Sequence, residues 1–377
     1  MKLAIITYHR AVNYGSALQA FALNHYLKTK GHFVRTIDYY NDEQKKIYQK
    51  YEESRNVMSI ARNIYTFIYR KKHDEKDRRF KDFIETFVPL TNTIGNDEKK
   101  LASIENEFDT FICGSDQIWN TNCYDFDNNY LLSFVKNKKK CCAYAPSIGT
   151  DRLDADSEKL LKKYLSEYRL LSVREKTGAK YLEQLIKRQV DNVLDPVFLL
   201  DNKEWRKMSN AVKVKGKYVL GYYIGDVAGM RDYGKKLAKK TGCKVIVIWK
   251  GLRDVFRSDI KAYDAGPREF LWLIDNAEYI CTNSFHAVAF SVIFEKKFWV
   301  FVGANDDKKP QSRIYDITEM LGLSNRILNE TNCRDVDFNS PIDWKNVYEK
   351  LNFNIQKSKR YLDKIINMED SYGVSMP

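Results

Sequence analysis

The stretch AEYICTNSFHAVAFSVIFEKKFWVFVG, residues 277–303, changes its hydrophobic period twice. Residues 279–281 are a short apolar run, residues 282–284 are all helix-capping types, and the apolar positions of 287–294 recur at helical spacing. A second apolar run occupies 298–302. The stretch therefore predicts a strand, a tight turn, a helix and a second strand, which together form the βαβ unit of a parallel sheet.

One histidine, His286, lies in the first turn of this predicted helix. Ligands collect at the carboxyl ends of parallel strands, where the next helix presents unpaired backbone N–H groups and a partial positive charge. The helix dipole disfavours a positively charged ring, which favours a neutral imidazole that can accept a proton. We therefore expect the active site here, although a surface or capping histidine fits the same spacing.

Strand and helix patterns alternate along the rest of the chain. Strands are expected at 3–8, 33–39, 108–113, 141–148, 170–173 and 190–194 in the first half, and at 217–224 and 243–249 in the second. The polar stretch 201–216 is the best candidate for a boundary between them. We predict an α/β protein with two Rossmann-like domains, 1–205 and 206–377, whose strand ends meet across a cleft.

Composition narrows the functional classes. The 377 residues include 63 Lys and Arg against 50 Asp and Glu, a formal net charge of +13 that favours nucleic acid, an anionic membrane face or phosphorylated small molecules as partners. The seven cysteines show no C-x-x-C spacing, which argues against a disulfide framework and against a zinc site. We expect a reduced, cytoplasmic protein without a secretory signal, a membrane span or a metal.

Polar residues at the predicted strand ends of the first half are further candidates. They are His9, Arg10 and Asn13 after the first strand, and Gly114, Ser115 and Asp116 after the strand at 108–113. The first of these turns lacks the G-x-G-x-x-G pattern, so a dinucleotide site is not expected. The alternative for the first group is a solvated loop with Asn13 or Ser16 as helix cap. For the second group it is an ordinary strand-to-helix turn in which Asp116 is the cap.

Arg174 follows the short predicted strand 170–173. An arginine at a strand end is suited to bidentate contact with phosphate or carboxylate. A surface ion pair is the alternative.

Six blocks of the chain, in one order, resemble the polysaccharide pyruvyl transferase family. They are NYGSALQAFAL (13–23), FDTFICGSDQIWN (108–120), SVRE (172–175), LDPVFLL (194–200), TNSFHAVAFSVIFEKKFWVF (282–301) and SRIYDITEMLGL (312–323). The resemblance implies a GT-B-like architecture with an acceptor side in the first domain and a donor side in the second. It also implies transfer of the enolpyruvyl group of phosphoenolpyruvate onto sugar hydroxyls, as a ketal, during synthesis of a bacterial surface polysaccharide.

The resemblance also suggests roles for the candidate residues. His286 would be the acid/base, with Arg174, Arg313, Asn283 and Ser284 binding the donor, while the acceptor would meet His9, Arg10, Asn13, Gly114, Ser115 and Asp116. Phosphoenolpyruvate would be a co-substrate, and no cofactor or metal would be needed. The acceptor would be a sugar that is lipid-linked or part of a polysaccharide repeat unit.

Two other functional classes stay open. One is a glycosyltransferase that uses a nucleotide-sugar donor, since it would share the architecture. The other is a non-catalytic basic binder of nucleic acid or anionic lipid, although no stacking motif favours nucleic acid and we expect no such partner.

Residues 41–90 read as amphipathic helices inserted in the first domain. Their basic residues would form a solvated face, or would rest on anionic lipid at the inner face of the membrane.

Overall fold

The computed structural model describes residues 1–47, 51, 56–150, 152–224, 229–248, 260–262, 264–303, 312–329, 332–333 and 336–367. The contacts within the chain divide it into two compact units. The first unit comprises Met1–Tyr48, Ile84–Leu200 and Lys350–Pro377, and the second comprises Gln49–Phe83 and Asp201–Glu349.

The first unit is built on a parallel sheet in the order β2-β1-β3-β4. Its strands are β1 (Lys2–Ile6), β2 (Phe33–Thr36), β3 (Thr110–Cys113) and β4 (Cys141–Ala143), and β5 (Ser172–Val173) pairs separately with β6 (Asp191–Asn192). Its helices include α1 (Tyr14–Thr29), α2 (Asp42–Ile47), α5 (Glu98–Ser103), α6 (Ala155–Leu165) and α7 (Lys176–Ile186).

One face of this sheet lies in a large buried cluster of the first unit. Ala4 and Ile6 of β1 share a buried cluster with Phe111 of β3 and with Leu161 and Leu182 of α6 and α7. These strand positions alternate, as expected for side chains on one face. Burial of this face fixes the register of the strands and so the positions of the residues that follow them.

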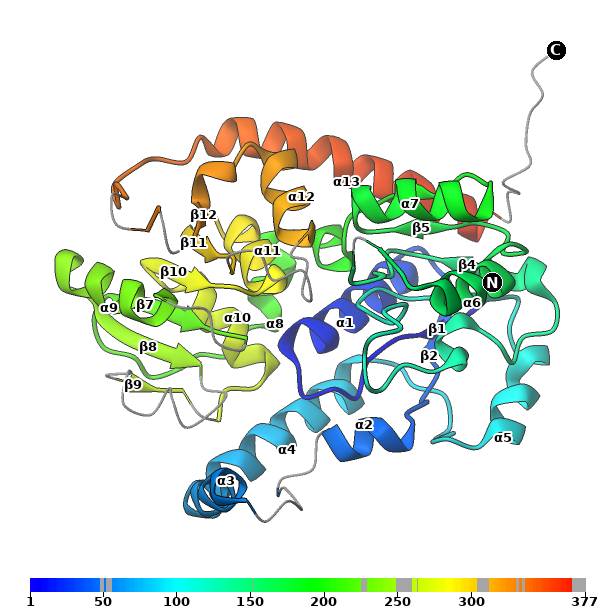
Figure 1. Cartoon of the computed structure of the whole chain (residues 1–377), viewed down its shortest axis with the longest axis horizontal. Helices are drawn as coiled ribbons and strands as arrows, with labels where there is room; N and C mark the ends of the chain where they lie inside the picture. Colours follow the sequence, from blue (N-terminus) through cyan, green and yellow to red (C-terminus); the bar gives the residue numbers. More distant parts are fainter. Residues whose placement is uncertain are drawn as a thin grey trace. The chain divides into compact units, whose positions relative to one another are not determined.

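The second unit has a six-stranded parallel sheet in the order β12-β11-β10-β7-β8-β9 (Figure 1). Its strands are β7 (Tyr218–Tyr222), β8 (Lys244–Ile248), β9 (Ile260–Lys261), β10 (Tyr279–Thr282), β11 (Lys297–Phe301) and β12 (Ile327–Leu328). Its helices include α8 (Asn202–Met208), α9 (Met230–Thr241), α10 (Pro267–Asp275), α11 (Phe285–Ile293) and α12 (Ser312–Leu321).

Aromatic contacts show how helices cover the two faces of this sheet. Tyr233 of α9 packs against Trp299 and Phe301 of β11, with ring centroids 6.1 and 5.1 Å away. On the other face, Phe270 of α10 meets Tyr222 of β7 at 5.3 Å. The unit is therefore a three-layer α/β structure of the Rossmann type, as expected from the alternating pattern.

The βαβ unit predicted at 277–303 is confirmed as β10, α11 and β11. β10 and β11 run parallel, with Tyr279 opposite Lys297. All nine residues of α11 are buried, because apolar side chains continue around the whole helix. His286 therefore lies on a buried helix rather than on a loose surface helix.

The observed division of the chain differs from the expected one in two segments. Most of α13 (Trp344–Ile366) belongs to the first unit, where the Tyr361 hydroxyl donates to the Ala143 carbonyl at 2.9 Å. Residues 49–83 belong to the second unit, where Arg79 donates to the Asp264 carbonyl at 3.0 Å. An amphipathic pattern shows that a helix has a buried face, but it does not show which sheet that face covers.

The helical character expected for residues 41–90 is seen in α2, α3 (Val57–Ile68) and α4 (Arg70–Phe87). Among the described helices, none combines the length and the apolar composition that crossing a membrane requires.

Candidate functional site

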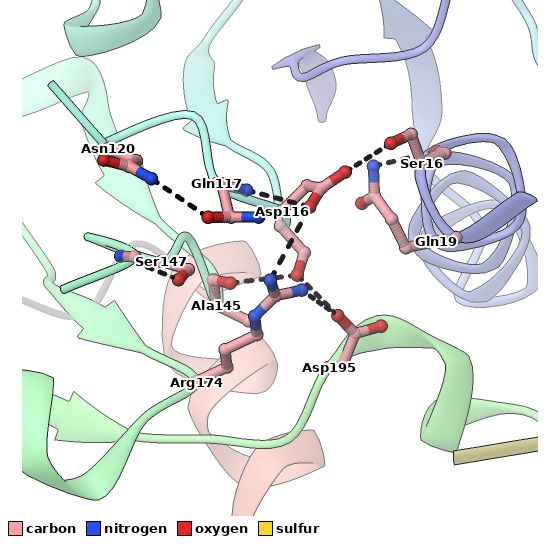
Figure 2. Close-up of polar contacts among 12 residues, drawn as sticks. Ser16, Gln19, Asp116, Gln117, Asn120, Ala145, Ser147, Arg174 and Asp195 are labelled. Atoms are coloured by element: carbon pink, nitrogen blue, oxygen red, sulfur yellow. Dashed lines mark hydrogen bonds and ion pairs between the residues drawn. The ribbon is translucent and has the colours of Figure 1, made fainter. Parts of the chain in front are cut away.

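The carboxyl ends of β1, β3 and β4 place a hydrogen-bonded cluster of polar side chains at one edge of the first unit (Figure 2). The strands are parallel and in register, with Ile6 beside Cys113 and Cys113 beside Ala143. Residues that follow these strands therefore emerge together. Ligands of open parallel sheets bind at this kind of edge.

Gly114 allows two of these strand ends to approach closely. Its amide donates to the Ile6 carbonyl at 2.8 Å. A Cβ at this position would lie 3.0 Å from Thr7 Cβ and 3.1 Å from Ile5 Cγ2, so a larger residue would push β1 and β3 apart. The structure gives Gly114 a packing role, and its expected contact with the acceptor stays a prediction.

Arg174 is a buried charge at the centre of the cluster, with its side chain 1% exposed. Its Nη1 donates to Asp195 Oδ2 at 2.7 Å and its Nε donates to Glu175 Oε1 at 3.2 Å, while Nη2 lies 3.6 Å from Asp116 Oδ1. Burial lowers the pKa of the guanidinium, but the three carboxylates outweigh burial and hold that pKa above its usual value. Arg174 therefore links three carboxylates of its own unit.

This arrangement bears on the expected role of Arg174 as a clamp for the donor. Arg174 does form ion pairs, but the surface location expected for them is wrong, because the guanidinium is buried. A phosphate that reached Arg174 would have to compete with three carboxylates that already surround it.

Asp116 joins three elements of the first unit. Its carboxylate accepts from the Ser16 hydroxyl of α1 and from the Gln117 amide at 2.9 Å, and its carbonyl accepts from the Ser147 amide at 2.8 Å. Its backbone has a φ of 78°, in the left-handed region that costs energy for a residue with a Cβ. Such a residue at a strand end is typical of functional sites, where the surrounding structure maintains the strain.

Ser115 precedes Asp116 and is fully buried. Its hydroxyl oxygen is 2.9 Å from both the Ala145 carbonyl and Asp195 Oδ2. Its side chain thus supports the network around Arg174 from inside the unit, and an acceptor would first have to open the structure to reach it.

A second cluster centres on Asp38, which follows β2 and was not identified from the sequence. His9 Nε2 lies 3.1 Å from Asp38 Oδ1, and Arg10 donates to the two carboxylate oxygens at 2.5 and 2.6 Å. The Thr93 hydroxyl donates a further hydrogen bond to Asp38 Oδ2 at 2.8 Å. Burial alone would raise the pKa of the Asp38 carboxyl, but these hydrogen bonds hold it well below its usual range.

His9 and Arg10 are therefore brought together, as expected, but by a carboxylate that the sequence analysis placed inside a strand. The sequence feature that could have identified Asp38 is its charge, since it lies near the end of the otherwise largely apolar predicted strand 33–39. The ladder of β2 stops at Thr36, so Asp38 stands beyond the strand.

Asn13 has the structural role that was the alternative in the sequence analysis. It is the N-cap of α1, and its side chain accepts from the Gly15 amide at 3.0 Å. The cap fixes where α1 begins and so positions Ser16 for its bond to Asp116.

In the second unit, the turn between β10 and α11 is held by its own side chains. Thr282 donates from its hydroxyl to the Tyr222 carbonyl at 2.6 Å and accepts from the Ser284 amide at 3.0 Å. Asn283 accepts from the Ile224 amide at 2.7 Å and donates to the Ile224 carbonyl at 2.6 Å.

Ser284 is the N-cap of α11, since its hydroxyl oxygen accepts from the Ala287 amide at 3.5 Å. Asn283 and Ser284, both expected to bind the donor, are thus engaged with the backbone of the turn. They position the start of α11, and a direct contact with the donor stays a prediction.

His286 is the second residue of α11 and is 8% exposed. Its ring meets the Phe285 ring edge to face, with centroids 5.2 Å apart. Since β10 ends at Thr282, the imidazole follows a central strand of the sheet within one helical turn. The structure therefore places His286 where the sequence predicted it, at the positive end of a helix at the carboxyl edge of the sheet.

Arg313 is the second residue of α12 and is partly exposed. Residues 304–311, which include most of the loop before it, lie outside the described part of the chain. Its expected contact with the donor stays a prediction.

Three solved structures illustrate the likeness of the whole chain. HepE of Anabaena, solved in complex with UDP and glucose, is 9% identical, with 98% of this chain and 97% of that chain covered and a TM-score of 0.50. UDP-GlcNAc 2-epimerase of Methanocaldococcus jannaschii is 13% identical, with 97% of this chain and 99% of that chain covered and a TM-score of 0.49. The ADP-heptose heptosyltransferase II of E. coli is 11% identical, with 95% of this chain and 100% of that chain covered and a TM-score of 0.40.

At such low identity the likeness to HepE shows the fold alone. Together with the two parallel sheets, it confirms the expected fold class of two Rossmann-like units of the GT-B type. A search of curated proteins finds no match.

A family model described as polysaccharide pyruvyl transferase matches residues 13–305. The matched region contains parts of both units. It includes Asp116, Arg174 and His286, whereas His9, Arg10 and Arg313 lie outside it. The match covers most of the chain, and the protein is therefore a transferase that belongs to the polysaccharide pyruvyl transferase family.

Proposed function

We propose that this protein transfers the enolpyruvyl group of phosphoenolpyruvate to hydroxyls of a sugar and forms a pyruvate ketal, during synthesis of a bacterial surface polysaccharide. Family membership supports the reaction class. The observation that carries the proposal is the position of His286 in the first turn of α11, at the carboxyl end of β10. A proton-transfer group and an anion-binding helix start are thereby combined in one turn.

The chemistry requires both of these elements. The methylene carbon of phosphoenolpyruvate gains a proton and becomes a methyl group, two sugar oxygens form bonds to the neighbouring carbon, and its bond to the phosphate oxygen breaks. Of the two protons lost by the hydroxyls, one balances the new methyl C–H bond and the other leaves with phosphate. An imidazole can move these protons, and the helix start stabilises the charge of phosphate or carboxylate.

The donor would be held in the second unit by the start of α11 and by Arg313. Arg313 lies in the first turn of a neighbouring helix of the same unit and would act as a cationic clamp. Arg174 was expected to help, but the three carboxylates around it favour a positioning role toward Asp116 and Asp195.

The acceptor would meet the strand ends of the first unit. Carboxylates, amides and a guanidinium are gathered there, in the cluster of Asp116 with Gln117 and Asn120 and in the cluster of Asp38 with Arg10. Groups of these types hydrogen-bond the hydroxyls of sugars. The acceptor would be lipid-linked or a polysaccharide repeat unit.

The test is turnover in D₂O with phosphoenolpyruvate and a panel of lipid-linked and pyrophosphate-linked sugars. The expected product carries deuterium in its ketal methyl group, and phosphate is released in equal amount. His286→Ala should reduce turnover by about 10²- to 10⁴-fold, the usual contribution of a general acid/base, and should leave most of the donor affinity. His32→Ala, which removes a partly exposed imidazole just before β2, is the matched control.

Turnover of His286→Ala within a few-fold of wild type would contradict the proposed proton transfer. Turnover should also survive chelation, since no metal is assigned to the reaction. Activity that depends on added Mg²⁺ or Mn²⁺ and on a nucleotide-sugar would instead identify a glycosyltransferase.

A further inference from the structure

Helix α3 presents an apolar face to the solvent. Ile60, Ile64, Phe67 and Ile68 are 48%, 57%, 57% and 66% exposed. Their spacing of four, three and one places them along one side of the helix. Soluble proteins rarely leave several large apolar side chains exposed together, and such a patch marks an interaction surface.

The opposite side of α3 is anchored within the protein. Tyr65 and Ser59 are buried, with 8% and 2% exposure. The next helix is tied to the second unit, where Lys72 pairs with Asp264 at 2.7 Å and Arg79 donates to the Asp264 carbonyl at 3.0 Å. The apolar face is therefore the outer side of an attached helix.

Positive charge adjoins this face where α3 meets α4. The Arg70 guanidinium lies over the Phe67 ring, 4.8 Å from its centroid, and Lys71 is exposed beside it. Residues 67–72 line an open pocket of about 300 Å³, and its lining includes both apolar and cationic residues. The sequence from 56 to 73 contains no acidic residue.

We propose that this surface, Ile60, Ile64, Phe67 and Ile68 with Arg70 and Lys71, docks the protein on an anionic membrane. Apolar side chains would enter the boundary between headgroups and acyl chains, while the two cations would meet lipid phosphates. The charge selects this occupant over a second copy of the chain. A symmetric contact between two copies would bring the same cations against each other without an acidic partner in the segment.

Docking would bring the enzyme to its acceptor if that acceptor is lipid-linked, a consequence that rests on the proposed function. The surface itself does not depend on the chemistry, because its residues are separate from His286 and from the Arg174 cluster. Vesicle binding without substrates therefore tests the docking alone.

The experiment is flotation of the full-length protein with vesicles of phosphatidylcholine, alone or with one third phosphatidylglycerol. The wild type should float with the anionic vesicles and much less with the neutral ones. Ile64→Glu/Phe67→Glu and Arg70→Gln/Lys71→Gln should each reduce binding by roughly tenfold or more, since a basic side chain near an anionic surface contributes about 1 kcal/mol. Both pairs are exposed, so the fold should persist, as circular dichroism would verify.

Two control variants match these changes in chemistry. Lys235→Gln/Lys236→Gln removes two exposed cations from α9 of the same unit, and Phe353→Glu changes an aromatic side chain that is 67% exposed on α13. Both should bind as the wild type does. A wild type that ignores anionic vesicles, or equal losses in the controls, would overturn the proposal. A wild-type dimer that Ile64→Glu/Phe67→Glu converts to a monomer would assign the face to a second copy and would also overturn it.

Discussion

Replacing Arg174 with methionine should destabilise the first unit by about 3–5 kcal/mol, the usual cost of removing one partner from a buried ion pair. The side chain is 1% exposed, so water does not screen its contacts. The substitution keeps much of the volume but leaves Asp195, Glu175 and Asp116 without their shared cation. Each kcal/mol lowers the Tm of a domain of 150–250 residues by roughly 2–4 °C, so the first unit should melt roughly 6–20 °C lower.

Calorimetric melting and a titration with phosphoenolpyruvate together separate the two roles of Arg174. If it mainly holds the carboxylates, Arg174→Met lowers the Tm by this amount, and Arg174→Met/Asp195→Asn recovers part of the loss because one buried negative charge is removed. The coupling between the two changes should be about 1–3 kcal/mol, as for residues in direct contact. A Tm within about 2 °C of wild type, with donor affinity abolished, would refute the reasoning and support the clamp.

Three further changes test separate features of the two units. Asp38→Asn should lower the free energy of unfolding by about 2–4 kcal/mol at pH 7. Because the folded-state pKa of Asp38 lies below its unfolded value, the extra stability of the wild type should be complete above pH ~5 and should shrink as pH falls below ~4. Urea unfolding at several pH values would show this dependence. Gly114→Ala should lower the free energy of unfolding by about 1–3 kcal/mol, because the added methyl group crowds β1. A Tm equal to that of the wild type would mean that β1 and β3 can move apart without loss of stability. Asn283→Ala should lower the unfolding free energy of the second unit by about 1–2 kcal/mol through loss of both bonds to Ile224, whereas a change in donor affinity alone would show direct binding.

The βαβ unit around His286 could be predicted because its signals are local. The apolar run of β10, the capping residues and the helical spacing of α11 follow each other within one short stretch. Parallel sheets repeat this pattern, so the fold class followed from the sequence as well.

Long-range placement could not be predicted in the same way. The bond from Tyr361 of α13 to Ala143 joins positions far apart in the chain, and a local pattern does not show such a contact. The charges that surround Arg174 come from Asp116 and Asp195 on distant segments as well as from the adjacent Glu175. Because a guanidinium fits a carboxylate as well as a phosphate, the residue type alone does not distinguish a structural ion pair from an anion clamp.

Asp38 was missed for a different reason. Ile37 and Tyr39 on either side of it are buried, so the alternating pattern continues past Thr36, where the ladder of β2 ends. A segment that leaves the strand but stays buried has the same sequence pattern as a strand that continues. The pattern therefore assigns the carboxylate that contacts His9 and Arg10 to the strand.

The central claim is that phosphoenolpyruvate is the donor, and calorimetric titration of the wild-type protein tests it most directly. Phosphoenolpyruvate should bind with one site per chain, and His286→Ala should retain most of that affinity while turnover is lost. A nucleotide-sugar and duplex DNA, titrated under the same conditions, should give no specific binding. Saturable binding of the nucleotide-sugar, with no heat from phosphoenolpyruvate, would contradict the proposed function.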